Sequence, residues 1–242
     1  TGYHGDAFRG PFEAQLGAHV QRGEFGGSIP DLSDIGTVVV EPIQGRGGVR
    51  VPPAGWLREL ADRTRMAGAV LVFDEVYTGF GRTGDWFAFQ HEDVRPDLLV
   101  LGKGMAGGFP ISACIGTAEA MDAWGASQGE ALHTQTFLGN PVGCAMAVAC
   151  IRELETIIPS LQEKCLWTAS ELRTRGYTIR GRGMMLGIEV PEALRVSREL
   201  LRAGFISLPA GENAEVIGLT PPLTITEQQL SAFFDALDRV CR

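Results

Sequence analysis

The chain has 242 residues, of which 45% are hydrophobic and 21% are charged, as in an ordinary globular protein with enough apolar surface for a core. Its 21 lysine and arginine residues against 29 aspartate and glutamate residues give a net charge of −8, which argues against a nucleic-acid-binding protein. Since no apolar stretch approaches the roughly 18 residues of a membrane span, we expect no membrane contact.

The cysteines are scattered, without a C-x-x-C pair and without a histidine at metal-ligand spacing. We therefore expect free thiols, a cytoplasmic location and no metal site. No signal peptide is recognised, and the chain begins at Thr1 without a methionine, which fits a processed terminus or a fragment. The five cysteines are Cys114, Cys144, Cys150, Cys165 and Cys241.

Strand and helix patterns alternate in the first half of the chain. Apolar runs predict strands at Thr37–Val40, Ala69–Phe73 and Asp97–Leu101. Between the first two, Ala54–Ala67 has apolar residues at a helical period, and Gly68 follows as a stop signal. This β-α-β order predicts a parallel sheet with helical crossovers.

The second half begins with a helix at Val142–Ala149, for which Asn140 is the expected cap and Pro141 the first residue. Beyond Pro159 the pattern changes, and Thr226-x-x-Gln229 predicts a capping box before the last helix. Further helices are expected at Leu161–Arg175, Glu192–Ala203 and Glu227–Val240, and strands at Met184–Val190, Phe205–Leu208 and Val216–Leu219.

These elements predict an α/β protein with two domains. The first, residues 1–158, is a large domain whose mainly parallel sheet carries helices on both faces. The second, residues 159–242, is a smaller C-terminal α/β domain. The run Arg180-Gly181-Arg182-Gly183 is interpreted as a turn leading into the strand at Met184.

Three polar residues follow the predicted parallel strands, where open sheets bind ligands. They are Glu41, Asp74 and Lys103, the last flanked by Gly102 and Gly104, which leave room for a ligand. A buried ion pair between Asp74 and Lys103 is one interpretation. The other is pyridoxal phosphate, which needs a lysine for its Schiff base and an acid to keep its ring nitrogen protonated. In that case Glu75 is expected to make structural hydrogen bonds nearby.

The sequence resembles the class III, fold-type-I aminotransferases that use pyridoxal phosphate. The resemblance rests on several motifs in the right order and covers nearly the whole chain. The motifs are YHG at 3–5, VVVEPIQGRGGVRVPP at 38–53, LVFDEVYTGFGRTG at 71–84, PDLLVLGKGMAGGFPISA at 96–113, TFLGNP at 136–141 and TPPLTIT at 220–226.

The resemblance implies a role for individual residues. Lys103 is the Schiff-base lysine and proton shuttle, and Asp74 pairs with the pyridine nitrogen. Val76 packs on one face of the ring and Tyr3 stacks on the other. Thr136 matches the threonine that reaches the cofactor phosphate across a homodimer interface.

Further residues are placed near the cofactor or the substrate by the same resemblance. Glu41 and Gln44 belong to the strand-end loop beside the site, with Glu41 on the substrate side. Tyr77 stands where other members have a glutamine that contacts the ring's phenolic oxygen. Arg82 is interpreted as bracing a loop or the dimer.

The chain also departs from the family. Other members carry a further segment before the motif at Tyr3, including a loop that holds the cofactor phosphate, so the chain is either a fragment or a shortened relative. Many members have a glutamate at position 46 and an arginine at position 218, which serve carboxylate recognition, whereas this chain has Arg46 and Gly218. Arg46 is therefore either a relocated carboxylate clamp or a solvated loop charge.

The function implied is a pyridoxal-phosphate-dependent transaminase that moves an amino group between an amine or amino acid, with a terminal (ω) amine favoured, and a keto acid. Racemisation and decarboxylation share Lys103 and Asp74 and remain alternatives. A truncated, non-catalytic remnant is the alternative from another class. The expected partners are small molecules and a second copy of the chain.

Overall fold

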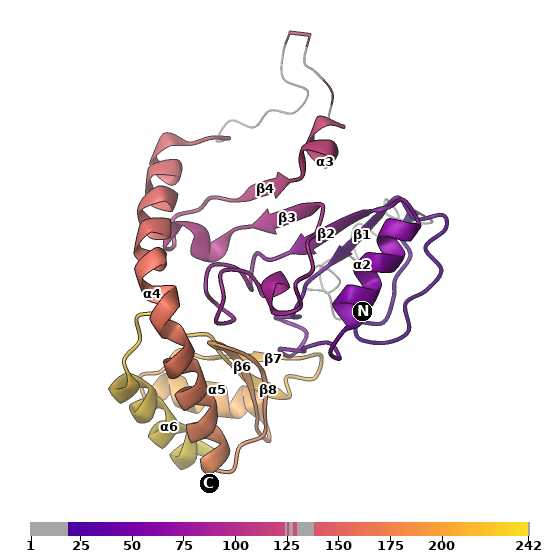
Figure 1. Ribbon diagram of the computed structural model, residues 1–242. Coiled ribbons are helices and arrows are strands. Elements are labelled where there is room, and N and C mark those ends of the chain that lie inside the picture. Colours follow the sequence, from indigo (N-terminus) through magenta and orange to yellow (C-terminus); the bar gives the residue numbers. More distant parts are fainter. Residues whose placement is uncertain (1–18, 124, 126–127, 130–137, 242) are drawn as a thin grey trace.

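The computed structural model describes residues 19–123, 125, 128–129 and 138–241, which form two four-stranded sheets (Figure 1). Two residues expected at the cofactor, Tyr3 and Thr136, lie outside the described residues. The α/β class expected from the sequence is confirmed.

The first sheet has the order β1-β2-β3-β4. The strands are β1 (Thr37–Val40), β2 (Val70–Asp74), β3 (Leu98–Leu101) and β4 (Ala113–Gly116). The first three are parallel, as the β-α-β pattern predicts, and the fourth is antiparallel to β3. β4 was not expected from the sequence.

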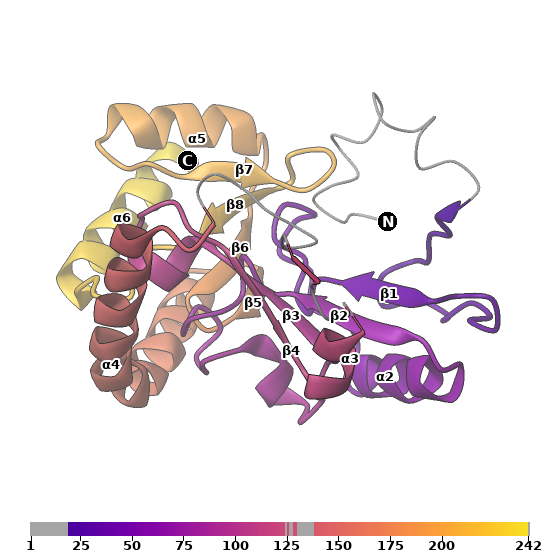
Figure 2. The same cartoon turned by 90° about the horizontal axis from the view of Figure 1, so that it is seen from above.

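The crossover between β1 and β2 contains helix α2 (Trp56–Met66), which packs against β2 (Figure 2). Its apolar stripe places Leu57 and Leu60 in the core, and Gly68 follows with φ +69°, a conformation that favours glycine. Three short helices follow: η4 (Ala88–His91), η5 (Lys103–Ala106) and α3 (Ala118–Asp122).

Helix α4 (Pro141–Thr174) is continuous, whereas the sequence predicted two separate helices over this stretch. Asn140 caps it as expected, since its Oδ1 accepts the N–H groups of Val142 and Gly143. Pro159 lies inside the helix because Ile158 before it and Leu161 after it are both buried and hold the turns around it in place. The domain boundary at residue 158 falls within α4 and stays a prediction.

The second sheet has the order β5-β6-β8-β7 and is antiparallel throughout. Its strands are β5 (Ile179–Arg182), β6 (Met185–Glu189), β7 (Leu208–Ala210) and β8 (Val216–Leu219). The interpretation of Arg180–Gly183 as a turn was wrong: Arg180 to Arg182 pair with β6, and only Gly183, at φ +61°, lies in the turn. The strand expected at Phe205–Leu208 begins only at Leu208.

Helices α5 (Ala193–Arg202) and α6 (Glu227–Cys241) lie beside this sheet together with the second half of α4 (Figures 1 and 2). The predicted capping box is confirmed, since Thr226 N–H donates to Gln229 Oε1 and Gln229 N–H donates to Thr226 Oγ1. Among the described residues, no helix is long and apolar enough to cross a membrane.

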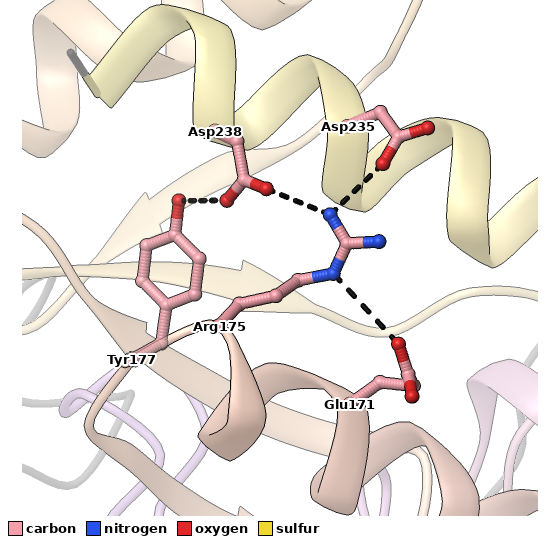
Figure 3. Close-up of polar contacts among 5 residues, drawn as sticks. All are labelled: Glu171, Arg175, Tyr177, Asp235 and Asp238. Carbon is pink, nitrogen blue, oxygen red and sulfur yellow. Dashed lines mark hydrogen bonds and ion pairs between the residues drawn. The ribbon is translucent and has the colours of Figure 1, made fainter.

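A polar cluster joins the end of α4 to α6 (Figure 3). Arg175 donates through Nη1 to Asp235 (2.9 Å) and Asp238 (2.7 Å), and its Nε lies 3.8 Å from Glu171. Tyr177 donates its hydroxyl to the other oxygen of Asp238. Desolvation and these hydrogen bonds raise the pKa of Tyr177 far above its usual range, so the phenol stays protonated.

Candidate active site

The carboxyl ends of three neighbouring parallel strands form the candidate site. In the sheet register Val40 pairs with Phe73, and Asp74 pairs with Val100. The residues that end or follow these strands therefore lie at the same edge of the sheet, as the sequence predicts. They are Glu41, Asp74 and Lys103.

Lys103 has a backbone conformation that is unusual for its residue type. Its φ is +38°, at the point where β3 leads into η5. A non-glycine residue in the left-handed region stores strain of about 1–3 kcal/mol, and such strain gathers at functional sites. The conformation fixes the direction in which this lysine leaves the strand end.

The amine of Lys103 is surrounded by charges from the neighbouring strand ends. Burial of the amine lowers its pKa below the ordinary 10.5, and the positive charge of Arg46 acts in the same direction. Asp74 and Glu41 act in the opposite direction because their carboxylates favour the charged amine. The site therefore holds an amine whose pKa depends on three identified neighbours, a property common at catalytic lysines.

Tyr77 lies against Lys103, whose Nζ is 4.2 Å from the centre of the tyrosine ring. The ring can sit there because residue 45 is a glycine: a Cβ at Gly45 would lie 3.1 Å from ring atoms of Tyr77. Val76 lies beside Gly102, and its N–H donates to Asp74 Oδ1 (3.1 Å). Val76 and Tyr77, which the resemblance places near the cofactor ring, thus lie next to Asp74 and Lys103 respectively.

Glu75 points away from this group and holds the following loop together. It is fully buried, and its carboxylate accepts the N–H groups of Ala88 (2.7 Å) and Phe89 (2.9 Å) and the hydroxyl of Thr78 (2.9 Å). Burial raises its pKa despite these donors. The expectation that Glu75 makes structural hydrogen bonds is confirmed.

The loop after β1 folds into a hairpin, residues 44–50, which we call the Arg46 hairpin. Backbone hydrogen bonds of 2.9 and 3.0 Å join Gln44 and Arg50 at its base. Glu41 is buried, and its Oε2 accepts the N–H of Gly45 (2.9 Å), so it braces this hairpin. Gln44 is buried at the hairpin's base, close to the strand ends.

Val49 anchors the Arg46 hairpin, and sequence reasoning missed it. Its φ is +53°, which is rare for a β-branched residue, yet its side chain is buried against Met185 and Ile43. The apolar contact compensates for the strained backbone. No sequence signal indicates a left-handed conformation at a valine.

A cavity of about 800 Å³ lies between the Arg46 hairpin and the second sheet. Arg46, Tyr77 and Gly218 all line it, so the three positions at which the resemblance leads us to expect other residues face the same space. The hairpin is tied to the far wall, since Gly211 N–H donates to the Arg46 carbonyl (2.9 Å). The remaining wall is largely apolar and includes Phe205, Leu208, Pro221, Ile225 and Phe233.

Arg82 connects the loop after β2 to the second sheet. Its Nη1 donates to the carbonyls of Met184 and Pro221. Burial lowers its pKa from the ordinary value. The expectation that Arg82 braces a loop agrees with these contacts.

The comparisons with known proteins identify the family. The profile of the family Aminotransferase class-III matches residues 31–241. The chain belongs to the class III aminotransferases. It is 40% identical to the acetylornithine aminotransferase of Methanopyrus kandleri over 232 residues, which is 92% of this chain but 59% of that protein. The chain thus spans less than two thirds of that curated relative.

Solved structures agree with this assignment. An ornithine aminotransferase from Toxoplasma gondii superposes with a TM-score of 0.75 at 34% identity, over 84% of this chain and 50% of that one. An ω-transaminase from Thermomicrobium roseum gives a TM-score of 0.74 at 28% identity, over 84% of this chain and 49% of that one.

Class III aminotransferases depend on pyridoxal phosphate. The side chains at the strand ends suit the ring end of that cofactor: the Lys103 amine with a lowered pKa, the half-buried carboxylate of Asp74 at the end of the neighbouring strand, and the small apolar side chain of Val76. Tyr3, expected on the ring, and Thr136, expected at the phosphate, lie outside the described residues.

Proposed function

We propose that the chain carries the catalytic lysine of a pyridoxal-phosphate-dependent transaminase that exchanges an amino group between an amine or amino acid and a keto acid. The observation that supports this most is the convergence of Glu41, Asp74 and Lys103 at adjacent strand ends, with the amine pKa lowered. A lowered pKa leaves a larger share of the amine neutral and able to act as nucleophile and base.

Each residue then has a defined task. Lys103 would hold the cofactor through Nζ; once the substrate amine has displaced it, the freed Nζ would take the proton from the amine-bearing carbon of the substrate and hold it until it is returned. Asp74 keeps the pyridine nitrogen protonated, and Val76 packs on the ring. Pyridoxal phosphate, when bound, supplies the electron sink for the carbanion at that carbon.

The other cofactor and substrate residues belong to the same proposal. Tyr77 is proposed to contact the phenolic oxygen of the ring, and Gln44 belongs to the loop beside the site. Tyr3 and Thr136, which lie outside the described residues, are proposed to stack on the ring and to reach the phosphate. Glu41 contributes its charge to Lys103 and braces the Arg46 hairpin. The proposed assembly is a homodimer. The proposed location is the cytoplasm, which agrees with the unpaired cysteines of the described residues.

A terminal amine is proposed as the donor, with Arg46 as the carboxylate anchor. The names of the relatives, an ornithine aminotransferase and an ω-transaminase, support such a donor. Arg46 is exposed, lines the same cavity as Gly218 and forms no ion pair with any other described residue. A guanidinium in that position can bind a carboxylate by two parallel hydrogen bonds, which a glycine at 218 cannot.

A second candidate is a chain that does not bind cofactor by itself. The observation that favours it is the span of the chain, which is 59% of the Methanopyrus kandleri relative. Racemisation or decarboxylation would use the same Lys103 and Asp74 and would show no net amino transfer to a keto acid.

Covalent labelling tests the proposal directly. The chain has lysine at only two positions, 103 and 164, and Lys164 donates to the Leu223 carbonyl far from the strand ends. After addition of pyridoxal phosphate and borohydride, peptide mapping is expected to place the pyridoxyl group on Lys103 and to leave Lys164 unmodified. Label on Lys164 alone, or on neither lysine, contradicts cofactor binding by this chain.

A further inference from the structure

A second cavity, of about 700 Å³, lies beside the end of the Arg46 hairpin. Its walls come from the segment that follows the hairpin and from strand β5. Three arginines line it, Arg50, Arg180 and Arg182, and none of its lining residues is acidic. This is unusual for a chain whose net charge is −8.

The three guanidinium groups differ in how far they are already neutralised. Arg180 is paired, since its Nη2 lies 3.1 Å from Glu189 and its Nη1 lies 3.9 Å from Glu215. Arg50 and Arg182 are exposed and form no ion pair with any described residue. Two positive charges therefore face the cavity without an ion-pair partner among the described residues.

Two acidic residues lie near the lining segments without being part of the lining. Glu24 precedes Phe25 in sequence, and the carboxylate of Asp85 lies 2.8 Å from Nδ1 of His91. The positive charge of Arg182 also reaches His91, whose pKa it helps to lower together with burial. Asp85 and Arg182 thus act on the same histidine, and no ion pair joins these two among the described residues.

The backbone that carries these arginines is held firmly. Arg50 is fixed by the two hydrogen bonds to Gln44 and is followed by Pro52 and Pro53. Arg180 and Arg182 are alternate residues of β5, so their side chains leave the strand on the same face. A firmly held backbone keeps the starting points of these side chains fixed, which lowers the entropic cost of ordering them around a ligand.

From this arrangement we infer that Arg50 and Arg182 bind a phosphate group, with Arg180 as a third, partly neutralised donor. A phosphate monoester or free phosphate carries nearly two negative charges at neutral pH, which matches the two unbalanced guanidinium groups. Arginine is the side chain best suited to this ligand, because its fork of N–H groups matches phosphate oxygens. Phe25 and Pro52 add apolar wall for an organic substituent.

Such a ligand would link the two sheets of the protein. Arg50 belongs to the base of the Arg46 hairpin, whereas Arg182 belongs to β5 in the second sheet. Gly48 of the hairpin already lies close to Arg180, since a Cβ there would be 3.4 Å from its Nη1. A bound phosphate would hold the Arg46 hairpin against β5 and so stabilise the position of the hairpin.

Calorimetric titration of the whole chain tests the inference, with inorganic phosphate and glycerol 3-phosphate as separate probes. The ionic strength is kept constant with sodium chloride, because general screening would otherwise mimic binding. Arg50→Gln and Arg182→Gln are each expected to weaken binding of both probes at least tenfold. Arg198→Gln is the matched control: it removes the same charge from an exposed arginine of α5 and should leave the affinity unchanged.

If Arg50→Gln binds either probe as tightly as the wild type does, the inference is wrong, and the probe binds at another place, such as the cofactor site. Absence of binding to the wild-type chain overturns it as well. Acetate is titrated as a singly charged comparison, and an affinity equal to that for phosphate also overturns the assignment. Circular dichroism of each variant checks that a lost affinity does not come from a lost fold.

Discussion

The Nζ of Lys103 lies 4.2 Å from the centre of the Tyr77 ring, so the lysine amine is held over an aromatic face. Such an arrangement attracts a charged amine. It also places any group attached to Nζ in the shielding region of the ring.

The contact predicts a specific NMR signal. Reductive methylation labels both Lys103 and Lys164, and the methyl protons on Lys103 are expected at higher field than those on Lys164. Tyr77→Leu should abolish the difference, whereas Tyr77→Phe, which keeps the ring, should preserve it. Equal shifts for both lysines in the wild-type chain would show that the ring does not cover Lys103 in solution.

Asp74→Asn is expected to impair catalysis more than folding. Asparagine retains an oxygen that can accept the Val76 N–H, but it cannot keep a pyridine nitrogen protonated. Removing one preorganised charged group typically costs a factor of roughly 100 or more in turnover. Because Asp74 also raises the pKa of Lys103, the variant should titrate Lys103 at lower pH. Turnover equal to that of the wild type would contradict the proposed role.

Lys103→Met tests how the lysine affects stability. Its pKa in the folded chain lies below the ordinary 10.5, so in the interval between these values the unfolded chain binds more protons than the folded one. The contribution of Lys103 to stability therefore increases as the pH rises through this interval, and at pH 7 its charge opposes folding. Methionine keeps the stem without the charge.

Urea unfolding of the cofactor-free protein should consequently show Lys103→Met to be more stable than the wild type at pH 7. The difference should become smaller as the pH approaches 10.5. A constant difference across this pH range would mean that the substitution acts through packing and not through the charge.

Arg175→Ala is expected to loosen the contact between α4 and α6 shown in Figure 3. Arg175 is mostly buried and joins Asp235 and Asp238 to the end of α4, so its loss leaves two neighbouring carboxylates without their shared donor. We expect the free energy of unfolding to fall by about 1–2 kcal/mol, between the values for exposed ion pairs and for hydrogen bonds to charged groups. Arg173→Ala, an exposed neighbour on α4, is the control and should change stability much less.

The candidate site could be predicted because its position follows from a rule of topology. Once three apolar runs are recognised as parallel strands, Glu41, Asp74 and Lys103 must gather at one edge. The long α4 was harder to predict, because Pro159 is a local stop signal that burial of Leu161 and Ile158 overrides. Local sequence contains no information about such long-range packing.

Strand β5 and the Arg46 hairpin show a different limit. Arg180 and Arg182 alternate with glycines, a pattern typical of turns, but hydrogen bonding to β6 makes them a strand. Gly181 is required there, since a Cβ at its φ of +109° would meet the Met185 carbonyl at 2.1 Å. The three arginines of the second cavity come from segments 130 residues apart in sequence, from Arg50 to Arg180, so only the fold reveals them.

The last prediction concerns Arg46 as the carboxylate anchor. Arg46→Ala should raise the KM for the keto acid and lower its turnover, while the half-reaction with an amine that lacks a carboxylate should be unchanged. The reason is that only the carboxylate loses a partner, and glycine at 218 offers no replacement on the opposite wall of the cavity. Steady-state kinetics of the two half-reactions measure this, with the exposed Arg202→Ala on α5 as the control.

A second readout separates the proposed anchor from a general loss of structure. The charge of Arg46 helps to lower the pKa of Lys103, so Arg46→Ala should move the titration of methylated Lys103 to higher pH even in the absence of substrate. A raised pKa together with a selective loss of keto-acid turnover supports the anchor. A raised pKa with both half-reactions unchanged would show that Arg46 acts on the lysine but is a solvated loop charge as far as the substrate is concerned. An unchanged pKa would mean that the hairpin does not hold Arg46 near Lys103, and the proposed clamp would then be wrong.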